Sequence, residues 1–89
     1  MKKQHVTVVN KLGLHARTSA QFVGLAHGFP CDVRIKRDDL SVNGKSLMAI
    51  LTLAASQGTK LVIQTDGEQE KKALHQLCAL VESGFGEKL

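Results

Sequence analysis

The sequence predicts an α+β fold in which a four-stranded antiparallel sheet is covered on one face by three helices, in the order β-α-β-β-α-β-α. Four short segments alternate apolar and polar residues, three longer segments repeat apolar residues at helical spacing, and turn residues separate them. Strands with one polar face are typical of antiparallel sheets that expose one side to water. We therefore expect a two-layer open-faced sandwich, formed as one domain over residues 1–89.

The first strand is predicted over residues 5–9, where apolar and polar side chains alternate. A helix is predicted over residues 16–27, because Gly28 is a favourable C-terminal cap and Pro30 cannot extend a helix. The apolar residues that predict its buried side are Ala16, Ala20, Val23 and Ala26, joined by Phe22 and Phe29.

A hairpin is predicted next, with strands over residues 31–37 and 40–42. The residues of this hairpin that we expect to point inward are Cys31, Val33 and Ile35. A short, very apolar helix is predicted over residues 47–55, and Ser46 is favourable at its N-cap. The residues of this helix that we expect in the core are Leu47, Ile50, Leu51 and Ala54.

A fourth strand is predicted over residues 60–65 and a final helix over residues 68–85. Glu68 and Glu70 would lie in the first turn of that helix, where the helix dipole favours carboxylates. The apolar stripe that predicts the helix consists of Ala73, Leu74, Leu77, Leu80, Val81 and Phe85. The glycines that predict a frayed end are Gly84 and Gly86.

Composition narrows the classes of function. The net charge is +4 with scattered basic residues, and only 3% of the residues are aromatic. Stacking platforms for single-stranded nucleic acid are therefore missing. Cys31 and Cys78 share no motif, so we expect free buried thiols rather than a disulfide or redox pair. The four histidines lack ligand spacing, so neither a metal nor another cofactor is expected.

The stretch NKLGLHARTSA, residues 10–20, places a histidine and an arginine where a helix begins. His15 would stand at or next to the N-cap, where free backbone N–H groups and the helix dipole favour phosphate. A neutral imidazole can act as a nucleophile, and Arg17 can add a charged, forked donor. The residues alone also allow His15 to be a surface or capping residue and Arg17 to be a solvated one.

The chain resembles the histidine-containing phosphocarrier (HPr) family of the bacterial phosphoenolpyruvate-dependent sugar phosphotransferase system. The segments that carry the resemblance are NKLGLHAR, VNGKSLMAILTLAASQGTKL and TDGEQEKKALHQLCALVESGFGE. The resemblance implies a phosphoryl carrier rather than an enzyme. Enzyme I would phosphorylate His15 at the ring nitrogen nearer the backbone, Arg17 would stabilise the phosphate, and the group would pass to an enzyme IIA domain. The nitrogen-related paralogue NPr, which works in a regulatory relay, is the alternative within the family.

The segment NGKSLMAI, residues 43–50, resembles the regulatory serine segment of the same family. The resemblance implies phosphorylation of Ser46 by an HPr kinase/phosphorylase, although capping alone also explains a serine here. The residues that it implies as contacts of enzyme I and enzyme IIA domains are Arg17, Ala20, Leu47, Met48 and Leu51. Thr18 departs from the family pattern, which usually has proline there, so we expect a slightly less rigid site.

Two other classes of function, nucleic-acid binding and small-molecule sensing, compete with this resemblance. A basic α+β sandwich permits nucleic-acid binding, and a small-molecule sensor would need a pocket that 89 residues are too few to enclose. The residues that the predicted open face of the sheet offers are Thr7, Arg34, Lys36, Val62 and Gln64. No long apolar run follows the N-terminal lysines, which argues against a signal peptide or membrane span. We expect a cytoplasmic monomer that binds no nucleic acid.

Overall fold

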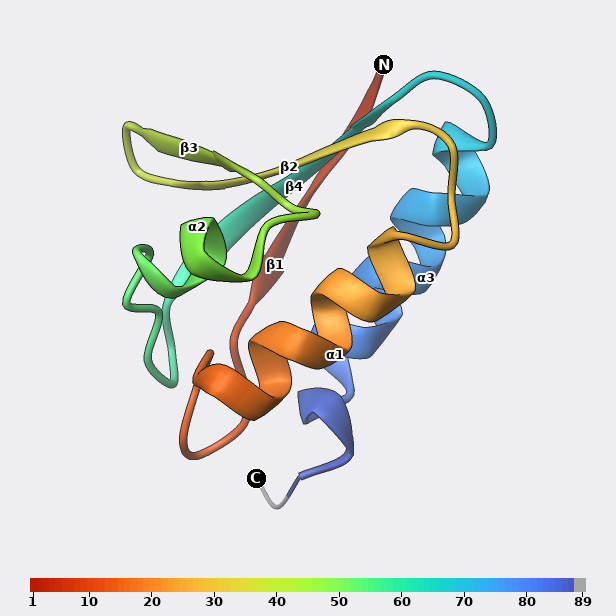
Figure 1. The fold of residues 1–89 in the computed structure, drawn as a ribbon. Coiled ribbons are helices and arrows are strands. Elements are labelled where there is room, and N and C mark those ends of the chain that lie inside the picture. The colour runs from red at the N-terminus through yellow and green to blue at the C-terminus, as the bar shows by residue number, and fades with distance from the viewer. Residues whose placement is uncertain (88–89) are drawn as a thin grey trace.

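The structure, a computed structural model, describes residues 1–87 and has the predicted fold class and order of elements. Its elements are β1 (Lys2–Thr7), α1 (Ala16–Ala26), β2 (Asp32–Arg37), β3 (Leu40–Asn43), α2 (Leu47–Leu51), β4 (Lys60–Asp66), α3 (Glu70–Glu82) and a 3-10 turn, η1 (Gly84–Gly86). Figure 1 shows the three helices on one side of the sheet. The last two residues of the predicted domain, 88–89, lie outside the described residues.

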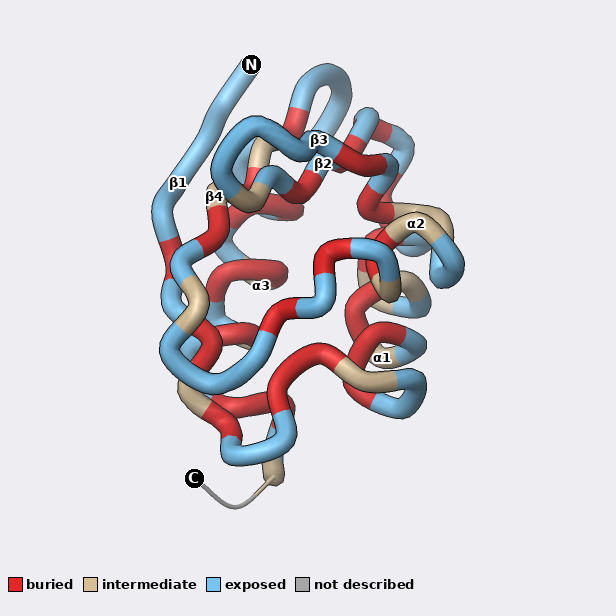
Figure 2. Tube along the Cα trace, turned by 90° about the vertical axis from the view of Figure 1, so that its left-hand side faces the viewer, coloured by how far each residue is buried: buried red, intermediate tan, exposed pale blue. Residues whose placement is uncertain are grey.

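All four strands form one antiparallel sheet in the order β1-β4-β2-β3, so β4 lies between β1 and β2. The helix-facing side of the sheet is apolar, as the alternation predicts. Its buried residues include Val6, Val33, Ile35, Val42, Leu61 and Ile63. Buried residues alternate with more exposed ones along β2 and β4, whereas β1 is mostly exposed (Figure 2). The hydrophobic layer between sheet and helices is the main stabilising feature of the domain.

Strand β1 is displaced from its predicted position at residues 5–9. It pairs with β4 from Lys2, opposite Thr65, to Thr7, opposite Lys60. Val8 is fully buried, but its N–H bonds to the Thr59 carbonyl at 2.9 Å, outside the strand. Residues 2–4 do not alternate apolar and polar side chains, so the sequence alone does not predict them as strand. They pair because β4 is long enough to lie opposite them. This extension adds Lys3 to the open face of the sheet.

Helix α1 ends as predicted, but its buried side is rotated from the expected one. The buried residues are Thr18, Ser19, Phe22 and Ala26, whereas Ala16 and Ala20 are exposed and Val23 is half-buried. Alanines contribute little to the hydrophobic stripe, so the bulky Phe22 decides which side faces the core. Ala20 is thereby left accessible beside the start of the helix.

Helix α2 is four residues shorter than the predicted 47–55. It ends at Leu51, and beyond that end the guanidinium of Arg37 on β2 donates to the carbonyls of Leu53 and Ala54 at 2.7 and 2.9 Å. Ala54 then adopts a left-handed conformation with φ 49°. Of the four predicted core residues only Ile50 is fully buried; Leu47 and Ala54 are exposed, Leu51 is half-buried, and Leu53 takes the second core position.

Helix α3 begins at Glu70 rather than Glu68, after Gln69 in a left-handed conformation. The predicted stripe is otherwise right, with Leu80 only partly buried. The predicted frayed end is wrong. The chain leaves α3 at Gly84, whose φ is 73°, and forms the turn η1, which buries Phe85 to 4% exposure. The hydrophobic side chain of Phe85 anchors the segment that follows.

The two cysteines are free and buried, as predicted from their apolar surroundings. Burial, together with the nearby carboxylate of Glu82, raises the pKa of the Cys78 thiol to about 11. The thiol is therefore protonated at neutral pH and acts as a small apolar side chain.

The N-terminal amine forms an ion pair whose contribution to stability should depend on pH. The amine lies 3.0 Å from Glu70 Oε2 and 3.6 Å from Asp66 Oδ1. The Gly67 N–H and then the amine lower the pKa of Glu70, and Glu70 raises the pKa of the amine. The carboxylate's contribution is lost as the pH falls through its lowered pKa, and the amine's as the pH rises through its raised pKa.

Glu70→Gln should therefore reduce the free energy of unfolding more at pH 6.5 than at pH 3 or pH 10, as measured by urea denaturation. Glu68→Gln makes the same charge change at an exposed residue for which residues 1–87 show no ion pair, and serves as control. An equal loss for Glu70→Gln at all three pH values would contradict the ion pair.

Candidate functional site

His15 lies at the N-cap of α1, as predicted, and is held there by the loop that precedes it. Gly13 has a φ of 69°, and a Cβ there would collide with the Ala55 carbonyl. The next N–H, that of Leu14, donates to the same carbonyl at 2.8 Å. The loop is therefore fixed against the segment after α2, which determines where the imidazole emerges.

The two nitrogens of the His15 ring face different partners. Nδ1 accepts a hydrogen bond from the Arg17 backbone N–H at 3.3 Å, and Nε2 lies 3.1 and 3.3 Å from Oε2 and Oε1 of Glu87. An ionised carboxylate can only accept, so Nε2 carries the proton in the neutral ring. Nδ1 then presents its lone pair toward the N-terminus of α1, where free N–H groups favour an anion.

Glu87 is itself positioned by a buried side chain. Asn10 is fully buried, and its Nδ2 donates to Glu87 Oε1 at 3.0 Å and to the Gly13 carbonyl at 2.9 Å. Asn10 therefore joins the loop before His15 to the segment after η1. Sequence reasoning missed both Asn10 and Glu87 as members of the site. Asn10 opens the recognised motif, but no local pattern indicates that a residue 72 positions away reaches His15.

Thr18, the departure from the family pattern, closes the start of α1 with its hydroxyl. The fully buried Oγ1 accepts from the His15 N–H at 3.0 Å and donates to the Gly13 carbonyl at 2.9 Å. With the bond from the Arg17 N–H to the His15 ring, this arrangement forms a capping box. A proline, which is usual here in the family, could make neither of these two hydrogen bonds. In this chain the hydroxyl of Thr18 takes the place of the rigid proline ring at the start of α1.

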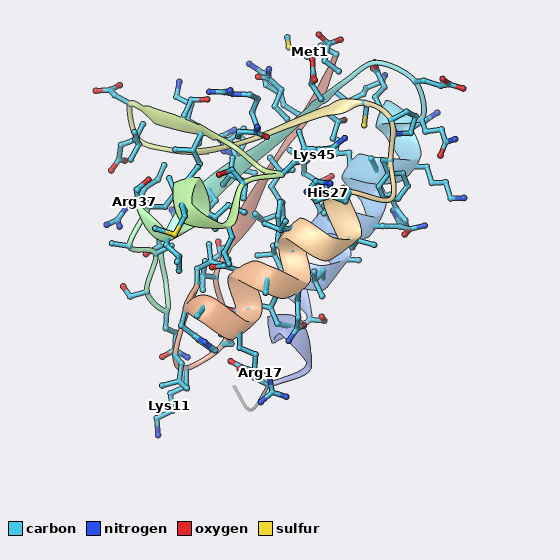
Figure 3. The ribbon with its side chains drawn as sticks, viewed as in Figure 1. Met1, Lys11, Arg17, His27, Arg37 and Lys45 are labelled. Carbon is cyan, nitrogen blue, oxygen red and sulfur yellow. The ribbon has the colours of Figure 1, made fainter. Side chains whose placement is uncertain are left out.

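Arg17 is exposed, two residues after His15 in the first turn of α1. It lines a hollow of about 530 Å³ together with Lys11, Leu12, Phe85 and Glu87. Figure 3 shows Lys11 and Arg17 at the same end of the molecule. Among residues 1–87 neither cation has an ion-pair partner within 4.0 Å. Both positive charges can therefore attract an anionic group near His15.

Ser46 lies at the N-cap of α2, as predicted, and its Oγ accepts a hydrogen bond from the Ala49 N–H at 3.3 Å. The side chain is half-buried, so its hydroxyl lies at the surface next to a helix start. α2 packs against α1, which brings the serine segment to the same face of the molecule as α1 (Figure 1).

The predicted docking residues lie on α1 and α2 and are largely accessible. Met48 is 73% exposed and Leu47 is 37% exposed. Ala20 is exposed and Leu51 is half-buried. Sequence reasoning missed Leu12, which is 72% exposed next to the His15 loop. Large exposed apolar side chains of this kind are common where a protein surface meets a partner.

The described part of the chain lacks two features, a membrane-spanning helix and a cluster of metal ligands. No helix within residues 1–87 combines the length and apolar character needed to cross a membrane. The same residues contain no group of three or more His, Cys, Asp or Glu side chains placed to hold a metal ion.

Comparisons with known proteins agree on one family. A family profile described as the PTS HPr component phosphorylation site matches residues 2–83. The phosphocarrier protein HPr of Pseudomonas aeruginosa is 50% identical over 88 residues, which cover 98% of each chain. The HPr-like protein Crh of Bacillus subtilis is 43% identical over 82 residues, 92% of this chain and 96% of that one.

Solved structures lead to the same family. A crystal structure of HPr from Thermoanaerobacter tengcongensis matches with a TM-score of 0.96 at 40% identity and covers 100% of both chains. A structure described as an HPr dimer from the same organism has a TM-score of 0.78 at 40% identity, covering 98% of this chain and 100% of that one.

Thr18→Val keeps the shape of the side chain but removes the hydroxyl that joins His15 to Gly13. Because the His15 N–H loses its partner and the Gly13 carbonyl keeps only the amide of Asn10, the free energy of unfolding should fall by about 1–3 kcal/mol in urea denaturation. Ser19→Ala is the matched control, since the neighbouring Ser19 Oγ is buried with no hydrogen-bond partner. It should be neutral or stabilising; an equal loss in both variants would contradict the role given to Thr18.

Proposed function

The chain belongs to the HPr family of the phosphotransferase system, a family of phosphocarrier proteins rather than catalytic enzymes, and we propose that it carries its phosphoryl group on Nδ1 of His15. The observation that supports this assignment is the placement of the ring. Nε2 faces a carboxylate, and Nδ1 faces the N-terminus of α1. A nucleophilic lone pair thus points at the place where a phosphate is most favoured.

Transfer would proceed by attack of Nδ1 on the phosphorus of the donor. A bond forms between Nδ1 and phosphorus while the donor's bond to phosphorus breaks. The ring keeps its proton on Nε2 and becomes positively charged. Glu87 lies opposite that proton, so its carboxylate stabilises the positive ring, and Arg17 stabilises the negative phosphoryl oxygens. When the acceptor takes the group, the ring returns to its neutral form.

A carrier must also release the group, so the stabilisation has to be modest. The His15 side chain is 31% exposed, and Arg17 is exposed as well. Interaction with the start of a helix contributes about 0.3–1 kcal/mol at such exposed sites. Water competes for the same phosphoryl oxygens. The site can therefore accept the phosphoryl group and release it again, rather than hold it permanently.

We propose phosphorylated enzyme I as the donor and enzyme IIA domains as acceptors, docking on the exposed side of α1 and α2. Residues 8–31 and 40–65 contain neither Asp nor Glu, so α1 and α2 themselves carry no negative charge. Met48 supplies an adaptable apolar centre, and Arg17 and Lys11 supply positive charge at one end. The complementary partner surface is an apolar hollow with acidic residues around it.

Ser46 provides the proposed regulation, which favours an HPr-type carrier over the NPr alternative. Its half-buried hydroxyl lies next to the docking residues Leu47 and Met48. Phosphorylation by an HPr kinase/phosphorylase would add nearly two negative charges to a surface that has none. An acidic partner would then be repelled. Within this proposal the protein acts as a cytoplasmic monomer, with gel filtration as the check on its oligomeric state.

The carrier assignment is tested by intact-mass spectrometry after incubation with phosphoenolpyruvate and enzyme I. The wild-type protein should gain one acid-labile phosphate, and His15→Ala should gain none. Glu87→Gln should still be phosphorylated, but about fivefold more slowly, because the charge-assisted hydrogen bond to Nε2 becomes a neutral one. A phosphate retained in His15→Ala, or an unchanged rate in Glu87→Gln, would overturn the corresponding part of the proposal.

The docking surface is tested by single changes that add negative charge. Met48→Glu and Ser46→Asp should each slow phosphorylation by enzyme I about tenfold or more, seen as a higher KM in a coupled assay. Ala79→Glu, at an exposed position on α3, is the control and should leave the rate unchanged. If all three variants slow transfer equally, the effect is one of net charge and not of the surface on α1 and α2.

A further inference from the structure

The open face of the sheet, opposite the helices and outside the His15 site, contains a hollow of about 420 Å³. Its charged lining residues, together with one histidine, are Lys3, His5, Arg34, Lys36, Asp38 and Lys60. This volume lies in the range of small-molecule sites, roughly 300–1,000 Å³. The sequence does not indicate this hollow, because Lys3 precedes the strand predicted over residues 5–9 and Lys60 is not among the residues predicted for the open face.

The strand register organises these basic residues into two rows across the sheet. Gln64 on β4 pairs with Lys3 on one side and with Arg34 on the other. Val62, two residues away on β4, pairs with His5 and Lys36. Each row therefore has a basic side chain on both sides of a neutral one. With strands about 4.8 Å apart, the flanking backbones are separated by roughly 10 Å.

The charge in the hollow is not neutralised from within. Four side chains are cationic and Asp38 alone is acidic, so three net positive charges line the hollow, out of a net charge of +4 for the chain. Among residues 1–87 none of these cations has an ion-pair partner within 4.0 Å. Like charges gathered on one face of a sheet repel one another and cost stability. An anion bound between the rows would offset that cost.

Arg34 is held in place before any ligand arrives. Its Nε donates to Ser41 Oγ at 3.2 Å, and its Nη2 donates to the Ser41 carbonyl at 3.0 Å. These two bonds fix the guanidinium over β3 and leave Nη1 free to donate. A side chain that is already ordered loses less conformational entropy on binding. Arg34 is therefore the anchor of the hollow.

We propose that this hollow binds a small anion with two or more phosphate groups, with Lys3 and His5 facing it from one side of β4 and Arg34 and Lys36 from the other. The charge of the hollow is complementary to such an anion, and its volume suits a small molecule. Single-stranded nucleic acid is disfavoured because no Phe, Tyr or Trp side chain lines the hollow for a base to stack on. The site does not depend on the chemistry of His15.

The test is a titration of the 15N-labelled protein with inorganic tripolyphosphate at 150 mM salt, followed by amide chemical shifts. Saturable shifts should be confined to the strands of the sheet, and centred on the residues that line the hollow. The double variant Arg34→Gln, Lys36→Gln should raise Kd at least tenfold. The control is the double variant Lys71→Gln, Lys72→Gln, which removes the same charge from exposed positions of α3. It should leave Kd within twofold of the wild-type value. Well-dispersed spectra confirm that each variant is folded.

Three results would overturn the proposal: no saturable shifts, an equal loss of affinity in both double variants, or shifts centred on Arg17. Hexaglutamate serves as a second probe. If it binds as tightly as tripolyphosphate, the proposal of a small phosphorylated ligand is wrong and an acidic peptide is the better assignment. His15→Ala should bind tripolyphosphate like the wild type. The outcome is therefore independent of whether His15 carries a phosphoryl group.

Discussion

The hydrogen bond between His15 Nε2 and the Glu87 carboxylate connects the two ends of the chain, and the site depends on it. β1 leads into the loop that ends at His15, while α3 packs on β1 and β4 and delivers Glu87 to the same place. Buried Phe85 fixes the final turn, and buried Asn10 joins that turn to the loop. The hydrophobic layer between helices and sheet thus determines which nitrogen of His15 faces the carboxylate.

The charges of the chain are distributed differently on its two faces. The surface of α1 and α2 is apolar and lacks acidic residues, which suits a partner with an acidic rim. The open face of the sheet is polar and carries an excess of cations over a hollow. The first surface suits protein partners that meet His15, and the second suits a small anion. Because the sheet separates them, each surface can be altered without changing the other.

Local patterns predicted the fold class, the hairpin, the N-caps at His15 and Ser46, and most of the core. They failed where distant residues decide the outcome. Arg37, on β2, binds the carbonyls of Leu53 and Ala54 in the segment where the apolar run predicted that α2 continues. The length of β4 extends β1 toward the N-terminus. Within the site, the motif predicted His15 at the start of α1, but Glu87 lies 72 residues away, and only the packed fold brings it there.

NMR can observe directly which nitrogen of the His15 ring carries the proton and which carries the phosphoryl group. Long-range 1H–15N correlation spectra of the unphosphorylated protein with a neutral His15 ring should show the proton on Nε2 and none on Nδ1. The spectrum of the phosphorylated protein should then show the 15N–31P coupling at Nδ1. A neutral ring with its proton on Nδ1, or a phosphoryl group on Nε2, would contradict the account.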